Sequence, residues 1–332
     1  MNRMVPGTRG MLAGRRATAV RAFAVVAVAV IGVATTPKIL SLLSLRSMFV
    51  VASFLGIVAI GQTLCVLLGE IDLSIAFLIG AADLGTLWLI DKGLASALAA
   101  IIMLAVCVAA GAVNGFVGHL VKGQSVVVTL GVGYVVLGGV QAVTTIGSSG
   151  AGTVYGKVPS WIVSVASVRG KLFGIPFPPA ILLWAVVAVA AGVWLRRAWL
   201  GRGMYALGGN AVAASRLLVP DRRIRVLAFA MSGLMAGVVG IMLLGFGGGA
   251  VADVGSPYLF MTVAAVAVGG TALAGGYGGI GFTVVGVVIL SVLNVVLVGS
   301  GLSNAVEQLI LGLLIVPAVA AYGRAPHPRT QV

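Results

Sequence analysis

Charged side chains are scarce in this chain of 332 residues: Asp, Glu, Lys and Arg together make up 8% of it, and only seven residues are acidic. Soluble domains carry about a quarter of charged residues, so this composition excludes a soluble globular protein. Hydrophobic residues make up 60% of the chain, and the mean hydropathy is +1.18. Apolar runs reach about 20 residues, the length that a helix needs to cross a hydrocarbon core of about 30 Å. Because helices satisfy their own backbone in lipid, the chain is predicted to be an all-α, polytopic membrane protein.

Residues that carry chemistry are also few. The two cysteines, Cys65 and Cys107, lie inside apolar runs and are expected to be small core residues rather than a disulfide. The phosphate-binding pattern G-x-x-x-x-G-K-[ST] is missing, and so are H-E-x-x-H, G-x-S-x-G and any Cys/His cluster with metal spacing. We therefore expect no catalytic residues, no metal and no cofactor on this chain. Energy for any transport has to come from another subunit or from an ion gradient.

The hydropathy pattern predicts ten spans and one membrane domain over residues 20–322. An even number of spans places residues 1–19 and the tail 323–332 on the same side. With both termini in the cytoplasm, fifteen Lys and Arg lie inside and six outside, as the positive-inside rule requires. We therefore attribute the net charge of +14 to the orientation of the chain in the membrane and to contact with anionic lipid, and not to nucleic-acid binding. The spans are 20–36, 48–68, 73–90, 94–117, 125–146, 180–195, 225–246, 258–274, 280–299 and 304–322.

Close helix packing is indicated by the 49 glycines of the chain. Gly233, Gly237 and Gly240 place small residues on one face of the seventh span, as in small-xxx-small contacts. This pattern fits packing within the chain or across a dimer.

Two long polar connectors interrupt the spans. The cytoplasmic loop 196–225 holds seven of the 21 Lys and Arg residues. Within it, Gly208-Gly209 would break the chain, Asn210 would cap a short helix over Ala211–Leu218, and Pro220 would stop it. Two turns of helix are not stable alone in water, so this segment is either part of a basic orienting loop or a docking helix for a cytoplasmic partner.

The external connector 147–179 is punctuated by glycine and proline. It is either a spacer or a landing surface for a component outside the membrane. Its WIVSVASV segment is compatible with a piece lying on the membrane surface or with a strand.

Ionisable groups inside spans cost about 2.5 to 3.5 kcal/mol each on insertion scales, so each is a functional candidate. Asp72 can cap the third helix, whereas Glu70 has no cation nearby in the sequence. Asp83 falls within a span and needs a partner or water. Glu307 follows Asn304 with the spacing of a capping box. No relay of several acids is visible, which argues against a gradient-driven transporter.

Uncharged polar residues inside spans serve either as contacts between helices or as parts of a polar path. Thr63, Thr129, Gln141 and Thr271 belong to this group. The residues assigned to a candidate translocation path are Gln62, Asp72, Asn114, Asn294 and Gln308.

Several blocks of the sequence resemble one family. GQTLCVLLGEIDLS, from Gly61, is similar to the G-Q-T-L-V-x-x-x-G-G-I-D-L-S signature of bacterial ABC sugar permeases of the ribose and monosaccharide type. Further blocks follow in the family's order and extend the resemblance over about residues 48–322. They are GAVNG at 111–115, VTLG at 128–131, GRGMYALGGNAVAASRL at 201–217 and VAVGGTALAGGYGGI at 266–280.

The resemblance implies a permease subunit of the bacterial plasma (inner) membrane. Two copies, as a homodimer, would form the pathway, an ATPase subunit carrying ATP and Mg²⁺ would bind beneath it, and an extracytoplasmic sugar-binding protein would deliver a monosaccharide. The segment after Gly208 then resembles the coupling helix of this family. Its coupling residues would be Gly208, Gly209, Asn210, Ala213, Ala214 and Arg216, with the glycines allowing a sharp turn and the alanines keeping the helix thin.

The chain departs from the family pattern at a few positions. Glu70 stands at a usual glycine, Gln124-Ser125 at a usual Pro-Pro, and Leu259 and Met261 at frequent acids. The sugar is therefore left open. A self-sufficient secondary transporter or channel for a small polar solute is the alternative function.

Overall fold

The computed structural model describes residues 41–121, 123–146, 152–171 and 174–299, together with residues 306, 309, 312 and 313. The predicted span 20–36 lies outside the described residues, and so does the predicted span 304–322 apart from these four positions. The described elements are α2 (Leu42–Leu67), α3 (Ser74–Asp91), α4 (Ser96–Leu120), α5 (Ser125–Thr145), β1 (Thr153–Val154), α6 (Ser160–Ala166), α7 (Pro179–Arg197), α8 (Trp199–Gly209), α9 (Ala211–Arg216), α10 (Asp221–Gly247), β2 (Ala250–Val251), the 3₁₀ helix η2 (Ala252–Gly255), α11 (Tyr258–Gly269) and α12 (Ile280–Gly299).

Eight of these segments are long and apolar enough to cross a membrane: α2, α3, α4, α5, α7, α10, α12 and the η2–α11 segment from Ala252 to Gly269. They overlap eight of the predicted spans, with three clear differences in the boundaries. α2 begins at Leu42 and not at residue 48, α11 ends at Gly269 and not at residue 274, and α10 begins at Asp221 and not at Arg225. An acidic residue in the first turn suits the positive end of the helix dipole, so Asp221 lets the helix begin directly after Pro220.

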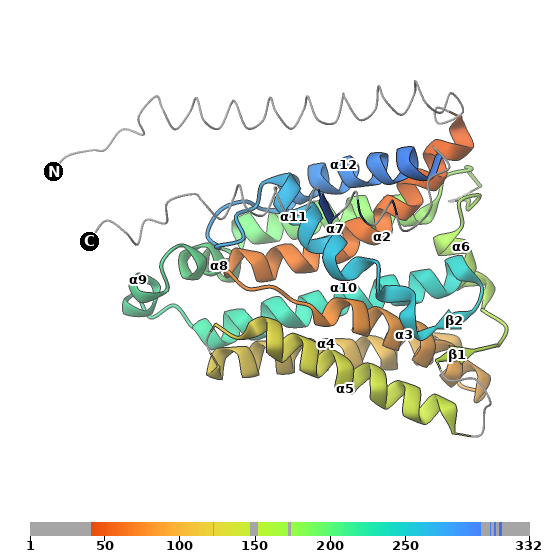
Figure 1. Cartoon of the computed structure of the whole chain (residues 1–332), viewed down its shortest axis with the longest axis horizontal. Coiled ribbons are helices and arrows are strands. Elements are labelled where there is room, and N and C mark those ends of the chain that lie inside the picture. Colours follow the sequence, from red (N-terminus) through yellow and green to blue (C-terminus); the bar gives the residue numbers. More distant parts are fainter. Residues whose placement is uncertain are drawn as a thin grey trace.

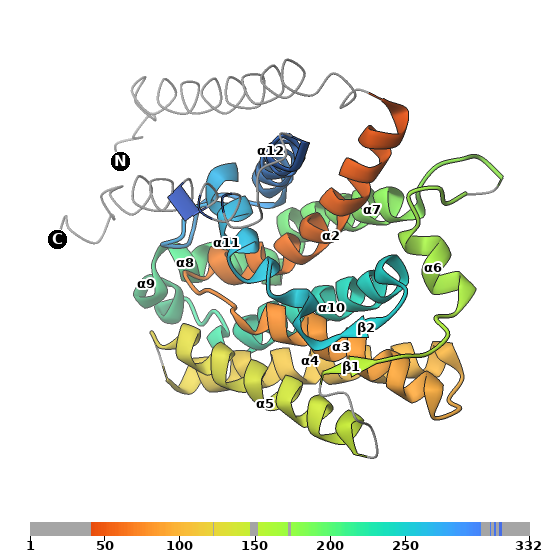
Figure 2. The same ribbon diagram turned by 45° about the vertical axis from the view of Figure 1, so that its right-hand side comes forward.

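The helices form a bundle with α2, α3 and α10 at its centre. Figures 1 and 2 show α4 and α5 along one side of these three helices and α11 and α12 along the other. In α2, 94% of the most apolar window is buried, against 11% in α5. The bundle has two ends, which are named here by what lies there: the α9 end and, opposite it, the β end with β1, β2 and α6 (Figure 1).

Helices α4 and α10 pack against each other in a regular antiparallel register. A Cβ atom on Gly233 would lie 2.1 Å from the Cys107 carbonyl oxygen, and one on Gly111 would lie 2.1 Å from that of Phe229. One turn further along α4, a Cβ atom on Gly115 would lie 2.6 Å from the Arg225 carbonyl oxygen. Each step of four residues forward on α4 is thus matched by four residues back on α10. The small-xxx-small face of the seventh span packs within the chain.

The β end is closed by short pieces. β1 pairs antiparallel with β2, so that Thr153 lies opposite Val251. The WIVSVASV segment forms the helix α6, so the strand alternative is wrong. Trp161 of this helix donates a hydrogen bond to Ser96 Oγ over 2.9 Å, which ties the connector that contains α6 to the start of α4.

Candidate coupling site and polar centre

The corner between α8 and α9 lies at Asn210. Its backbone is extended, with φ −156° and ψ 96°, and its Oδ1 atom accepts a hydrogen bond of 3.0 Å from the Ala213 amide. The predicted cap is therefore confirmed. The predicted break at the glycine pair is wrong, because Gly208 and Gly209 complete the last turn of α8. The polar cap, rather than glycine freedom, redirects the chain.

Gly208 has a different role, which is close packing. A Cβ atom there would lie 1.9 Å from the Leu67 carbonyl oxygen and 2.6 Å from the Gly276 nitrogen. The Gly276 amide in turn donates to the same Leu67 oxygen over 2.9 Å. The end of α8, the end of α2 and the segment 271–279, here called the glycine loop, therefore meet backbone to backbone.

The glycine loop depends on left-handed backbone. Gly275 and Gly276 have φ of 89° and 75°, a conformation that residues with a Cβ rarely adopt. Tyr205 of α8 donates from its hydroxyl to the Gly278 carbonyl over 3.0 Å. Burial raises the pKa of Tyr205, so the hydroxyl keeps the proton that it donates. These contacts fix the base of α9 to the bundle.

The outer face of α9 is exposed and largely apolar. Ala214 is buried against the bundle, so this residue cannot form part of an outer contact surface as the sequence suggested. Ala213 and Arg216 are exposed, as are Val212, Leu217 and Leu218. Leu218 has a φ of +57°, a left-handed conformation that is uncommon for a residue with a side chain. α9 ends at Arg216, two residues earlier than predicted.

A connected set of charged side chains lies at the same end of the bundle as α9. Arg225 forms an ion pair with Glu70 through Nη1, and its Nε donates to Asp221 Oδ1 over 2.6 Å. The second Asp221 oxygen lies 3.0 Å from His119 Nδ1. These four residues, here called the charge network, come from the α2–α3 connection, the first two turns of α10 and the last turn of α4. Glu70 thus finds its cation 155 positions away along the chain.

Asp72 is the centre of a buried polar cluster. Its Oδ1 atom accepts hydrogen bonds from the Ser74 amide at 2.9 Å and the Ser74 hydroxyl at 2.6 Å. Asn114 of α4 donates to the same Ser74 hydroxyl over 2.9 Å. Thr129 of α5 accepts from the Leu73 amide over 3.1 Å. Asp72 therefore bonds the first residue of α3, close to its predicted role, although the N-cap position is Leu73, and two further helices are joined to this end of α3.

Asp83 finds its partner in the backbone, because its Oδ2 accepts from the Val251 amide over 2.7 Å and links α3 to β2. Gln62 is completely buried, and neither of its amide atoms has a hydrogen-bond partner within the described ranges. One residue on, the Thr63 hydroxyl shares a 2.6 Å hydrogen bond with that of Thr283 on α12.

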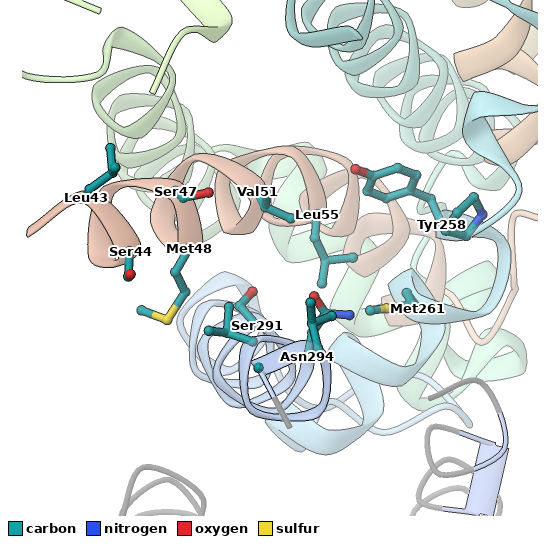
Figure 3. Close-up of a pocket in the computed structure, with 14 residues that line it drawn as sticks. Leu43, Ser44, Ser47, Met48, Val51, Leu55, Tyr258, Met261, Ser291 and Asn294 are labelled. Atoms are coloured by element: carbon teal, nitrogen blue, oxygen red, sulfur yellow. The ribbon is translucent and has the colours of Figure 1, made fainter. Parts of the chain in front are cut away.

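A cavity of about 550 Å³ lies between α2, the start of α11 and the second half of α12. Figure 3 shows Asn294 beside Met261 and Leu55, with Ser291 one turn before it on the same helix. The cavity belongs to the half of the bundle nearer the β end, since it is lined by the beginning of α2 and the end of α12. Its walls are mostly apolar, with the hydroxyl groups of Ser44, Ser47, Tyr258 and Ser291 among them.

The residues assigned to a candidate translocation path therefore lie in different parts of the molecule. Asp72 and Asn114 join one cluster, Asn294 lines the cavity, and Gln308 lies outside the described residues. Sequence reasoning missed Arg225, Tyr205 and Thr283. The spacing of Asp221 and Arg225, four residues apart on a helix, was a visible signal for a pair. The other two contacts join residues far apart in sequence and left no local signal.

Comparison with known proteins gives the family. The model of the "branched-chain amino acid transport system / permease component" family matches residues 44–319. Among curated relatives, the ribose import permease protein RbsC of Escherichia coli K12 is 30% identical over 286 residues, which is 86% of this chain and 87% of RbsC. The autoinducer 2 import system permease protein LsrD of Escherichia coli HS is 27% identical over 299 residues, 89% of this chain and 88% of LsrD.

A third relative, the probable ABC transporter permease protein YphD of Escherichia coli K12, is 38% identical over 153 residues. That match covers 46% of this chain and 45% of YphD. No solved structure matches the chain significantly. With eight apolar spans and a family match over most of its length, the chain belongs to the branched-chain amino acid transport system / permease component family, and it is a multi-pass permease of the bacterial inner membrane rather than an enzyme.

Proposed function

We propose that this chain is the membrane-spanning subunit of an ABC importer. It moves a monosaccharide or a related small polyol from an extracytoplasmic binding protein into the cytoplasm, and a separate subunit that holds ATP and Mg²⁺ supplies the energy. The observation that carries this proposal is α9, a six-residue helix with an exposed apolar face that follows directly on α8, whose last turn packs on the bundle backbone to backbone. Support for the substrate class comes from RbsC and LsrD, which are named as import permeases for ribose and autoinducer 2.

The α9 end is assigned to the cytoplasm. Seven arginines lie there, in the part of the chain from α7 to the second turn of α10, and cations concentrate on the cytoplasmic side of membrane proteins. With that orientation, both termini are cytoplasmic and α9 faces the ATPase. Val212 and Leu217, which are 64% and 78% exposed, provide the apolar surface that fills a groove on the ATPase, and Arg216 pairs with an acidic side chain at its rim.

The pathway is completed by a second copy of this chain. The cavity beside Asn294 lies in the half of the bundle nearer the β end, and in this orientation the β end is the side on which the binding protein releases its sugar. Amide and hydroxyl groups in an otherwise apolar wall suit a sugar, which has apolar ring faces and a rim of hydroxyl groups. Asn294 belongs to the part of the path nearer the β end. Asp72 and Asn114 belong to the part nearer the α9 end.

Docking of the ATPase can be tested with the substitution Ala213→Arg. The Ala213 side chain is exposed, and the residue supports α9 through its backbone, which an arginine keeps, so the substitution obstructs the groove without opening the bundle. We expect the affinity for the cognate ATPase subunit, measured by titration in nanodiscs, to fall by about tenfold or more, as for other central interface positions. Sugar uptake driven by ATP should fall with it.

Ala95→Arg is the matched control, because it places the same side chain at an exposed position at the β end. It should leave ATPase binding unchanged. Normal binding and normal uptake with Ala213→Arg would contradict the proposal. Uptake into vesicles that contain an ion gradient and no ATPase would instead establish a secondary transporter.

A further inference from the structure

The charge network connects the base of α9 with the polar cluster around Asp72. At one end, four residues separate Arg216, the last residue of α9, from Asp221. At the other end, Glu70 lies two positions before Asp72, which accepts hydrogen bonds from Ser74 at the start of α3. The side chain of Arg225 bridges these ends, since it contacts both Glu70 and Asp221. The network is thus a side-chain connection that runs beside the backbone route through α10.

Burial makes this connection unusual. Among the described residues, Arg225 is the only buried lysine or arginine, and Glu70 is 7% exposed. Desolvation offsets most of the attraction within a buried ion pair, so such a pair contributes little to stability compared with apolar residues of the same shape. Its directional hydrogen bonds, however, define the position of the groups that they join. This favours a role in positioning over a role in stability.

The remaining contacts constrain how the two ends can move. Gly115 brings the α4 backbone directly against Arg225, and His119, one turn further, contacts Asp221. Gly69, beside Glu70, has a φ of +76°, and a Cβ atom there would lie 3.0 Å from the Ala274 carbonyl of the glycine loop. The α2–α3 connection therefore lies between α10 and the glycine loop. A displacement of α10 reaches this connection directly through Arg225.

We propose that Glu70 and Arg225 are positioning residues that transmit movement of α9 to the α2–α3 connection and so to the Asp72 cluster. This inference rests on the proposed function, because it assumes that an ATPase moves α9. The pair does not contact the ATPase, and it does not hydrolyse ATP. Its effect is on how much sugar is transported for each ATP that is hydrolysed.

The test is Glu70→Gln in the complete transporter, reconstituted with its ATPase and its binding protein in liposomes. The substitution keeps the shape of the side chain and removes the charge that holds Arg225. We expect unchanged affinity for the ATPase and unchanged basal hydrolysis, with transport per ATP reduced roughly 2- to 30-fold, the range seen for residues that carry coupling between sites. Glu70→Asp, which keeps the charge, should retain most of the coupling. Asp91→Asn, an exposed carboxylate at the β end, is the matched control and should have no effect.

A second variant separates positioning from a simple folding defect. Glu70→Gln combined with Arg225→Gln leaves no unpaired buried charge between these positions, so its thermal stability should be closer to that of the wild type than that of Glu70→Gln alone. We expect it to remain uncoupled. Wild-type transport per ATP in either Glu70→Gln or this double variant would overturn the inference. If the unmodified chain neither binds an ATPase nor transports sugar with it, the proposed function itself fails.

Discussion

At the scale of single residues, the space left for a side chain separates two neighbouring glycines of α8. A Cβ atom on Gly208 would meet the Leu67 carbonyl oxygen at 1.9 Å, whereas a Cβ atom on Gly209 would meet nothing within 4 Å. Both residues are helical, so neither is required for its backbone conformation. The first is required for contact between α8 and α2, and the second is free to change.

Gly208→Ala is therefore expected to destabilise the protein by about 1 to 3 kcal/mol, as other substitutions that overpack a close contact do. Gly209→Ala should be neutral or stabilising by up to about 1 kcal/mol, because alanine favours a helix over glycine. Thermal unfolding of the two variants in detergent measures the difference. Equal stability of the two variants would show that α8 does not pack on α2 as closely as described.

At the scale of elements, α4 and α10 form the most extensive contact between two of the described helices, through glycines spaced four residues apart. Gly111 and Gly115 belong to α4, and Gly233 belongs to α10. Backbone packing of this kind provides van der Waals contact and weak C–H···O bonds in place of the hydrophobic effect, which is lost within lipid. The same register places His119 beside Asp221, so the packing of the two helices also positions the charge network.

Gly111→Ala is expected to separate α4 from α10, since its Cβ would lie 2.1 Å from the Phe229 carbonyl oxygen. A loss of about 1 to 3 kcal/mol in the free energy of unfolding follows from this overpacking. Gly118→Ala is the control on the same helix, because its Cβ would meet nothing within 4 Å. Denaturation of the purified chain in mixed micelles measures both. A stable Gly111→Ala variant would contradict the backbone contact.

The sequence predicts elements well where a single property decides them. Apolar length alone located the eight crossing segments that the structure describes, and a polar side chain at Asn210 located the start of α9. Contacts between distant residues were not predictable in this way. Glu70 and Arg225, or Thr63 and Thr283, are joined by the arrangement of whole helices, and nothing in their sequence neighbourhoods specifies the partner. The role of Gly208 was misread for the same reason, because its contacts lie on α2 and in the glycine loop.

At the scale of the whole molecule, orientation in the membrane is the property on which the proposed function depends. The α9 end and the β end are far apart in the bundle (Figure 1), and each exposes positions suited to chemical labelling. Ser215 lies on α9, and Tyr155 at the β end is 84% exposed. The native thiols of Cys65 and Cys107 are both fully buried, so they should react little with an added maleimide.

We expect Tyr155→Cys to react with a membrane-impermeant maleimide in intact spheroplasts, and Ser215→Cys to react only after permeabilisation. The physical reason is the excess of arginine at the α9 end, which favours retention of that end in the cytoplasm. The unsubstituted chain, labelled in parallel, gives the background from the two buried cysteines. The reverse pattern of labelling would place α9 outside the cell and remove any possibility of contact with a cytoplasmic ATPase.

The close contact between α4 and α10 also determines which parts of the molecule can slide during a transport cycle. Where a carbonyl group lies opposite a glycine, no side chain is present that could repack into a second arrangement, so we expect these two helices to move as one rigid body. Relative motion is then expected at helix interfaces that are made of side chains. The interface of α5, which is little buried, and that of α12, which lines the cavity, are examples. A hinge between the α4–α10 pair and the helices α5 and α12 would open the molecule without separating α4 from α10.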